Sequence, residues 1–213
     1  IFNANAKFIQ VDIEAEEIGR NRSVDLGVVS DVKVMLAELV RIVDGRKIGQ
    51  KLAKQYEEWV GTVRAADAAG KAQAKPMWEK EGVPIHPLRL AREINDFMDR
   101  EDDIVVADGG DTSIWMNMTR TMRRPGHHLE SGLFGCLAYG IPAVNAAKLL
   151  YPEKRVLLVI GDGSVGFNFM EFHTAIRNNL PIVVVVANDT LWGMIAHSQQ
   201  IRLGHAIKDG TDL

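Results

Sequence analysis

Residues 156–194 have the sequence VLLVIGDGSVGFNFMEFHTAIRNNLPIVVVVANDTLWGM, and this stretch decides the fold. The apolar run 156–160 stops at the GDG motif of residues 161–163, and a second run, 182–186, stops at Asn188-Asp189. Apolar residues between the two runs recur at helical spacing, at Phe169, Phe172, Ile176 and Leu180. Two β-branched runs that flank a helical segment predict a β-α-β unit with parallel strands.

Two aspartates should meet at one edge of this predicted sheet. Because the carboxyl ends of parallel strands lie together, the side chains of Asp162 and Asp189 are expected to converge there. Paired carboxylates suit Mg²⁺, which prefers oxygen ligands and often shares its coordination with phosphates. Gly163 would let the backbone approach a phosphate closely, and a helix that starts near Ser164 would favour an anion. The residues therefore predict a diphosphate held through a metal ion.

The same residues fit a second interpretation. Gly161-x-Gly163-x-x-Gly166 follows a strand, as the glycines of dinucleotide-binding proteins do, and Asp189 lies about where a ribose-binding acid would. A dinucleotide-binding oxidoreductase therefore stays open on these residues. Asp162 argues against it, because a carboxylate between the first two glycines would repel a pyrophosphate unless a metal ion separated them.

The motif spacing resembles that of thiamin-diphosphate-dependent enzymes. The GDG motif, a spacer of 24 residues and Asn188-Asp189 resemble their GDG and Asn-Asn motif. With Asn179-Leu180-Pro181 and Trp192-Gly193-Met194, the stretch is similar to the acetolactate synthase, benzaldehyde lyase and oxalyl-CoA decarboxylase branch. Asp189 stands where the motif has asparagine, but aspartate is also a good Mg²⁺ ligand. The resemblance implies an α/β fold, a parallel sheet flanked by helices, preceded by the tail of another α/β domain.

A glycine-rich segment supports this resemblance. Residues 131–142, SGLFGCLAYGIP, are similar to the family's S-G-x-x-G-x-M-G-x-G-x-P segment. There the apolar residue holds thiamin in its bent shape, and a backbone carbonyl two residues earlier accepts a hydrogen bond from the aminopyrimidine. The resemblance implies Leu137 as the supporting residue and Gly135 as the carbonyl. For Cys136 we favour a small buried thiol, because no base is recognisable beside it.

The resemblance also implies metal ligands and further cofactor contacts. The loop 108–112, DGGDT, follows a predicted strand over 104–107 and would meet the diphosphate. Asp111 would repel that anion unless it faces elsewhere or caps the following helix. The implied metal ligands are Asp162, Asp189 and the backbone carbonyl of Leu191. The candidate cofactor-binding residues are Gly110, Asp111, Thr112, Gly135, Leu137, Asp162, Gly163, Ser164, Asp189, Leu191, Trp192, Gly193 and Met194.

Other ionisable residues carry weaker signals. His197 lies on the helix expected after the second strand, and it is the histidine for which a substrate role is worth testing. His86 is expected at a helix entry, and His173 in a surface or packing role. The basic cluster 120–128 could bind an anionic substrate or a CoA phosphate, although a solvated face or a subunit contact is as consistent with it.

Composition and pattern divide the chain into three parts. A strand over 7–13 and a helix over 31–43, capped by Ser30 or Asp31, resemble the end of the family's middle domain. The start at Ile1 and the lack of a closing element suggest that both ends are cuts. The expected parts are residues 1–45 from the middle domain, a connecting helix and linker over 46–82, and a C-terminally truncated diphosphate-binding domain over 83–213.

The composition narrows the class of protein. The 213 residues are 46% hydrophobic and 25% charged, with a formal net charge of −3, so no basic excess points to nucleic acid. No apolar run approaches a membrane span, and a single cysteine fits a reducing compartment, so a cytoplasmic protein is expected.

These observations and the resemblance together predict a function. The leading hypothesis is a thiamin-diphosphate- and Mg²⁺-dependent enzyme, similar to acetolactate synthase, that forms or cleaves C–C bonds of 2-oxo acids. The alternatives are a relative acting on acyl-CoA, the dinucleotide-binding oxidoreductase, and a non-catalytic relative suggested by Asp189. The family's activating glutamate lies in an upstream pyrimidine-binding domain, usually of a partner subunit. We therefore expect that domain and a homodimer or homotetramer as partners, besides a small-molecule 2-oxo acid or acyl substrate.

Overall fold

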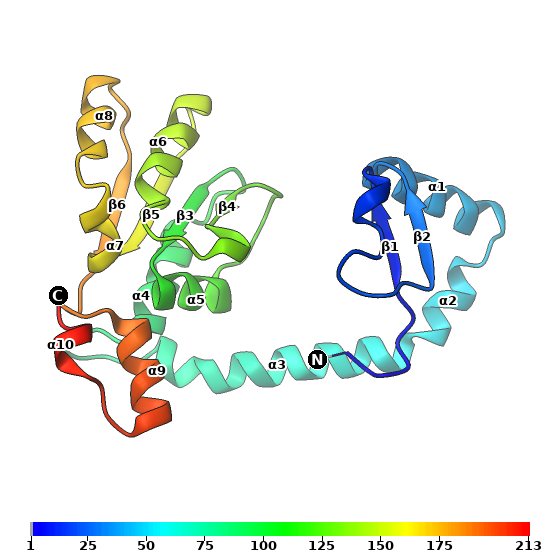
Figure 1. The fold of residues 1–213 in the computed structure, drawn as a ribbon, viewed down its shortest axis with the longest axis horizontal. Helices are drawn as coiled ribbons and strands as arrows, with labels where there is room; N and C mark the ends of the chain where they lie inside the picture. The colour runs from blue at the N-terminus through cyan, green and yellow to red at the C-terminus, as the bar shows by residue number, and fades with distance from the viewer. Residues whose placement is uncertain (1) are drawn as a thin grey trace. The chain divides into compact units, whose positions relative to one another are not determined.

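The computed structural model describes residues 2–213, which divide into two units. One unit ends at Ala69 and the other runs from Gly70 to Leu213 (Figure 1). The segment predicted as a connecting helix and linker contains α2 (Gly49–Gln55) and α3 (Glu57–Trp78), and the division between the units falls inside α3. Pro76 lies in the last turn of α3.

The N-terminal unit is a two-stranded parallel sheet with helices. Its elements are β1 (Ile9–Asp12), the 3-10 helix η1 (Ala15–Glu17), β2 (Leu26–Val29) and α1 (Val32–Gly45). The predicted cap of α1 is confirmed, since a carboxylate oxygen of Asp31 accepts a hydrogen bond from the Val34 N–H at 3.1 Å. The sequence predicts β1 but not β2, which pairs with it from Ile9 opposite Leu26. Gly27 interrupts the apolar pattern of β2, so the sequence does not reveal this strand.

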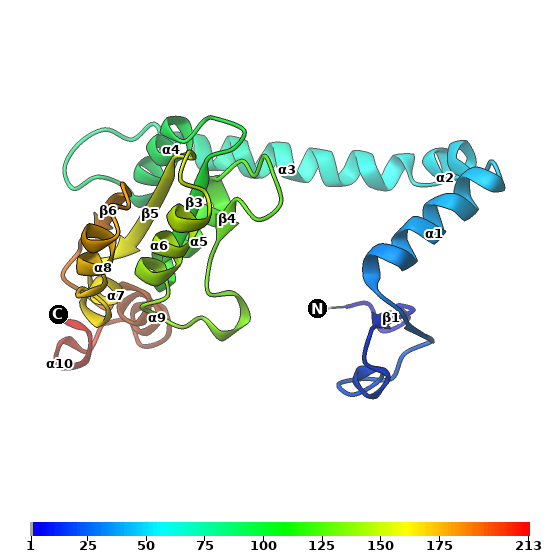
Figure 2. The same ribbon diagram turned by 90° about the horizontal axis from the view of Figure 1, so that it is seen from above.

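The C-terminal unit contains a parallel sheet with strand order β4-β3-β5-β6. All three pairings are parallel, as the apolar runs predict. Figure 2 shows the sheet with helices packed around it. In chain order the elements are α4 (Pro87–Phe97), β3 (Ile104–Asp108), α5 (Gly110–Thr119), β4 (His128–Leu129), the 3-10 helix η2 (Gly132–Phe134), α6 (Gly140–Leu150), β5 (Val156–Gly161), α7 (Asp162–Phe167), α8 (Glu171–Arg177), β6 (Val183–Ala187), α9 (Gly193–Leu203) and α10 (Lys208–Thr211).

The two faces of this sheet pack against different helices. Alternate residues of β3 and β5, such as Val105 and Leu157, join α4 and α5 in one apolar cluster. Their neighbours in the strands, such as Val106 and Leu158, join α6 in a second cluster. Both strands are therefore buried on both faces, which explains why they read as continuous apolar runs. The fold class predicted from the sequence is confirmed.

The segment between β5 and β6 differs from the prediction. The spacing of Phe169, Phe172 and Ile176 predicts one helix, whereas the structure has two, α7 and α8, separated by residues 168–170. Asn168 leaves the helix, and its side-chain N–H donates to the carbonyl of Ala138 at 2.8 Å. Phe172 packs against the sheet, while Phe169 and Ile176 are exposed. A hydrogen bond to another segment therefore interrupts the helical pattern.

The start of α4 agrees with the role predicted for His86. The His86 Nδ1 atom accepts the backbone N–H of Leu88 at 3.2 Å, and Pro87 occupies the first helical position. His86 therefore caps the helix.

Along residues 2–213, no helix combines the length and the apolar character that crossing a membrane requires.

Candidate active site at the carboxyl edge of the sheet

The loops that follow β3, β5 and β6 meet at one edge of the sheet. Asp108 at the end of β3 pairs with Ile160, and Gly161 at the end of β5 pairs with Ala187. The residues after each strand therefore lie side by side at the carboxyl edge, where α/β sheets bind ligands. The predicted β-α-β unit is confirmed, and it brings the GDG motif next to the loop that contains Asp189.

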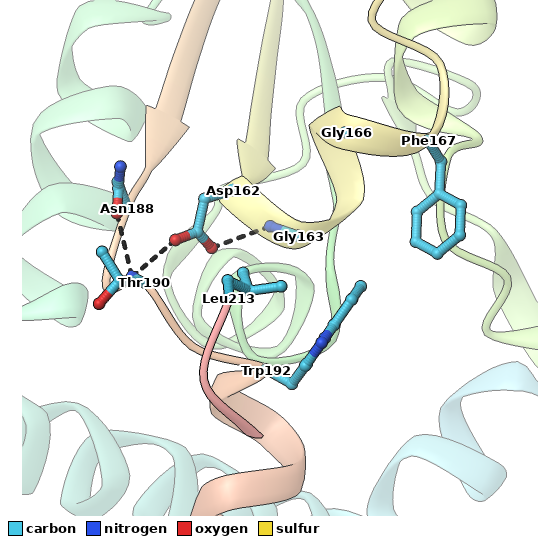
Figure 3. A pocket seen from close by; sticks show the side chains of 8 residues that line it. All are labelled: Asp162, Gly163, Gly166, Phe167, Asn188, Thr190, Trp192 and Leu213. Carbon is cyan, nitrogen blue, oxygen red and sulfur yellow. Dashed lines mark hydrogen bonds between the residues drawn. The ribbon is translucent and has the colours of Figure 1, made fainter. Parts of the chain in front are cut away.

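A pocket of about 480 Å³ opens beside Asp162 (Figure 3). The Asp162 carboxylate accepts the Gly163 N–H on Oδ1 at 2.9 Å and the Thr190 N–H on Oδ2 at 2.7 Å. The second bond joins the start of α7 to the loop after β6. The residues that line the pocket are Asp162, Gly163, Gly166, Phe167, Asn188, Thr190, Trp192 and Leu213.

The second predicted metal ligand, Asp189, faces the start of α9. Its Oδ1 accepts the Leu191 N–H at 3.1 Å, and its Oδ2 lies 2.8 Å from the position that a Cβ on Gly193 would occupy. Oδ2 of Asp111 lies 3.6 Å from the same position. Asp189 and Asp162 thus accept neighbouring N–H groups of one turn, those of Leu191 and Thr190.

The donor set is compatible with a hard cation. Within residues 2–213, no three His, Cys, Asp or Glu side chains gather as a metal site. A cation here would therefore draw on the two aspartates, a backbone oxygen and the phosphates of a ligand, which is how Mg²⁺ is usually bound. The ligand roles of Asp162, Asp189 and the Leu191 carbonyl stay predictions.

Two glycines of the site make room for large side chains. A Cβ on Gly163 would lie 2.7 Å from the Trp192 ring, and a Cβ on Gly110 would collide with the Met194 sulfur. From the sequence, Gly163 is expected to leave space for a phosphate. In the structure, the indole ring of Trp192 occupies the space beside it. Trp192 and Met194 thereby pack the start of α9 against the first turns of α7 and α5.

The charge of Asp111 is directed toward α9. The helix α5 begins after Gly109 without a side-chain cap, so the alternative that Asp111 caps it is wrong. Asp111 Oδ2 instead lies 2.5 Å from Nδ1 of His197. The sequence predicts both residues near the site but gives no signal that they touch, because 86 positions separate them.

Asp108 is a central residue that the sequence analysis misses. It is only 3% exposed, and its carboxylate accepts hydrogen bonds from the Gly109 N–H, the Ser164 hydroxyl and the Gly140 N–H. The side chain of Ser164, a predicted cofactor contact, is therefore engaged inside the protein and 2% exposed. An acidic residue that ends a buried apolar strand is the signal that could have revealed Asp108.

In the glycine-rich segment, residues 132–136 are exposed, whereas Gly140 and Ile141 are buried at the start of α6. Gly135 has a left-handed backbone with φ of 55°, and Leu137 is half-buried. Cys136 is exposed, so the prediction of a buried thiol is wrong. The apolar surroundings in the sequence, Leu133 and Phe134, are themselves exposed and do not cover it.

The basic cluster 120–128 serves the fold in this structure. Arg120 and Arg123 both donate to the carbonyl of Met98 at the end of α4, and Arg124 pairs with Glu101. Burial lowers the pKa of Arg120 and also that of His128. Arg120 is thus buried away from any anionic substrate, whereas Arg123 and Arg124 stay exposed.

Comparison with protein families identifies the class. Residues 108–211 match the thiamine pyrophosphate enzyme, C-terminal TPP binding domain, where thiamine pyrophosphate is another name for thiamin diphosphate. The resemblance to thiamin-diphosphate-dependent enzymes is therefore confirmed for these residues. The match includes the GDG motif, so the thiamin-diphosphate interpretation replaces the dinucleotide one.

The relatives come from two groups. The chain is 29% identical over 213 residues to a probable acetolactate synthase large subunit of Methanococcus aeolicus, covering 95% of this chain and 35% of the relative. It is 32% identical over 152 residues to the acetolactate synthase large subunit IlvG of Mycobacterium tuberculosis, covering 71% of this chain and 28% of the relative. It is 29% identical over 215 residues to 2-hydroxyacyl-CoA lyase 2 of Danio rerio, covering 99% of this chain and 33% of the relative. The chain thus spans about a third of the length of these relatives.

Proposed function

We propose that the complete protein is a thiamin-diphosphate- and Mg²⁺-dependent enzyme that forms or cleaves a C–C bond of a 2-oxo acid, as an acetolactate synthase does. The observation that carries this proposal is the meeting of three polar loops at the carboxyl edge of a sheet that matches the thiamine pyrophosphate family. The acetolactate synthase names among the relatives support the substrate class.

The residues of this edge would divide the binding of the cofactor among them. Asp162, Asp189 and the Leu191 carbonyl would hold Mg²⁺, which in turn binds the diphosphate. Gly110 and Thr112, at the N-terminus of α5, would meet the same anion. Gly135 would accept a hydrogen bond from the aminopyrimidine, and Leu137 would support the bend of the cofactor. The bound cofactor supplies the carbanion chemistry, while the protein binds and orients it.

A second candidate function is that of a 2-hydroxyacyl-CoA lyase. The relative from Danio rerio carries this name, and its match covers nearly the whole chain. The arginines of the basic cluster give this candidate no support, because they bond to Met98 and Glu101.

The remaining parts of the enzyme belong to the proposal as well. An upstream pyrimidine-binding domain would bring the activating glutamate, and a homodimer or homotetramer would join the two halves of each site. Residues 1–45, 46–82 and 83–213 would then correspond to the end of a middle domain, a linker and the diphosphate-binding domain. We place the enzyme in the cytoplasm, for which the single cysteine of these 213 residues is the support.

The experiment that tests the proposal is a substrate comparison on the complete protein. With Mg²⁺ and thiamin diphosphate present, pyruvate should yield acetolactate, and a 2-hydroxyacyl-CoA should not be cleaved at a comparable rate. Cleavage of the acyl-CoA alone would favour the second candidate. Calorimetry in the presence of a chelator should show no cofactor binding; undiminished binding without a divalent metal would contradict the metal-mediated site.

A further inference from the structure

A buried hydrogen-bond network joins three segments of the proposed cofactor site. Oδ1 of Asp108 accepts the Gly109 N–H at 2.6 Å and the Ser164 hydroxyl at 2.7 Å. Oδ2 accepts the Gly140 N–H at 2.7 Å. Asp108 therefore connects the end of β3 with α7, which begins at Asp162, and with α6, which follows the glycine-rich loop.

The network extends to the peptide of Ala138. The Ser164 hydroxyl oxygen accepts the Ala138 N–H at 3.0 Å, and the Asn168 side chain donates to the Ala138 carbonyl at 2.8 Å. Ala138 has a φ of 71°, a backbone conformation that residues other than glycine rarely adopt. The bonds from both sides hold this residue in a conformation that it would not adopt unaided.

The position of Ala138 gives this network its significance. It directly follows Leu137, and it lies three residues after Gly135. A fixed peptide at 138 sets where the half-buried Leu137 side chain and the preceding backbone lie. The amide and hydroxyl groups that fix it come from α7 and the residue after it, the segment that contains Asp162.

We propose that Asp108 is a positioning residue for the thiamin end of the cofactor. Through Ser164 and Gly140 it holds the loop of residues 135–139 against the start of α7. The loop that contacts the organic part of the cofactor is thereby kept in register with the loop that binds metal and diphosphate. This inference rests on the proposed cofactor site, but it assigns a role to a residue that would touch neither the metal nor the cofactor.

The opposite end of the same strand offers a matched control. Asp103 precedes β3 and is as buried as Asp108, at 1% exposed. Its carboxylate pairs with Arg155 and accepts the Arg100 N–H, all away from the carboxyl edge. An Asp103→Asn variant therefore reports what loss of a buried carboxylate from β3 does to the scaffold alone.

The test compares two ligands on the complete protein by calorimetry with Mg²⁺ present. One ligand is thiamin diphosphate, and the other is inorganic diphosphate, which lacks the thiamin part. In Asp108→Asn, the new amide N–H₂ faces an N–H or O–H donor, so a bond of the network is lost. We expect a Kd for thiamin diphosphate about tenfold higher, as for one lost buried hydrogen bond, and little change for inorganic diphosphate. Asp103→Asn should change neither the Kd for thiamin diphosphate nor the Kd for inorganic diphosphate.

Several outcomes would overturn the proposal. Equal weakening of both ligands by Asp108→Asn would make Asp108 a general scaffold residue, and unchanged affinity for both would remove its role altogether. If Asp108→Asn does not fold, Ser164→Ala takes its place, because it removes the link to Ala138 and should show the same selectivity for thiamin diphosphate. Failure of the unmodified protein to bind either ligand would contradict the proposed function itself, a result distinct from loss of selectivity in the variant alone.

Discussion

The two edges of the C-terminal sheet differ in the groups that contact their carboxylates. At the amino edge, Asp103 pairs with the Arg155 guanidinium, which also reaches Asp99. At the carboxyl edge, Asp108 and Asp162 accept only neutral N–H and O–H groups in the described contacts. At the amino edge, a guanidinium therefore compensates the negative charge. At the carboxyl edge, neutral donors orient the carboxylates but do not compensate their charge. An edge of the second kind attracts a cation, whereas the first kind serves stability.

The largest effect is expected from Asp162→Ala. Removing this carboxylate takes away one of the few protein ligands proposed for Mg²⁺ and the bond to Thr190, so the Kd for thiamin diphosphate should rise by about 100-fold or more. Calorimetry with Mg²⁺ measures the change. Asp162→Asn, which keeps a side-chain oxygen, should lose less affinity for thiamin diphosphate than Asp162→Ala. If Asp162→Ala bound the cofactor with undiminished affinity, the unbalanced charge of this edge would have no role in metal binding.

The matching change at the amino edge is Arg155→Ala. It leaves the Asp103 side chain, which is fully buried, without its cation, and should lower the free energy of unfolding by about 3 kcal/mol. Urea denaturation measures this loss. Affinity for thiamin diphosphate should stay near that of the unmodified protein at a temperature where both are folded. A variant of normal stability that binds the cofactor poorly would reverse the roles of the two edges.

Strain at the carboxyl edge can be relieved by Ala138→Gly. Because φ is 71° at this position, glycine should stabilise the protein by about 0.5–1 kcal/mol, which thermal unfolding can detect. The control is Ala147→Gly within α6, where the same change should destabilise by about 1 kcal/mol. Two variants that lose stability alike would show that Ala138 is not strained.

The smallest effect concerns pH and lies near the amino edge, where His128 pairs with Val105 of β3. Burial is the main cause that lowers the pKa of His128 in the folded protein. The unfolded chain therefore binds the proton more readily, so stability is full above the ordinary histidine pKa of about 6.5 and falls as the pH drops below it. Urea denaturation between about pH 7.5 and pH 5 should show a shallower slope for His128→Asn.

The exposed His173 provides the control for this pH experiment. A His173→Asn variant should keep the slope of the unmodified protein. If His173→Asn removed the slope and His128→Asn did not, the acid sensitivity would come from elsewhere than the buried imidazole.

Much of the fold follows from local patterns in the sequence. Strands β3 and β5 are buried on both faces, so their apolar runs and the turns after them are unambiguous. Asp31 and His86 also reveal themselves, because a helix cap depends on neighbours in the chain. The strand β2 gives no such pattern because Gly27 interrupts it, and the break between α7 and α8 arises from a bond to a segment 30 residues away.

The site is less predictable for the same physical reason. The Asp162 and Asp189 positions follow from motif spacing, but their hydrogen-bond partners depend on how the loops meet in space. The pairing of Asp111 with His197 and the network of Asp108 join residues far apart in the chain. A resemblance can indicate which residues gather at an edge, whereas the direction of each carboxylate is set by tertiary contacts.

The contacts of Gly110 with Met194 and of Gly163 with Trp192 have a consequence for how this sequence can vary. A methyl group at either glycine would collide with a side chain more than 25 positions away. The two positions of each pair should therefore covary among natural relatives. Where one position has a large residue, the other should have glycine. A combinatorial library over positions 110 and 194 should accordingly recover active clones with a bulkier first residue only where the second has shrunk.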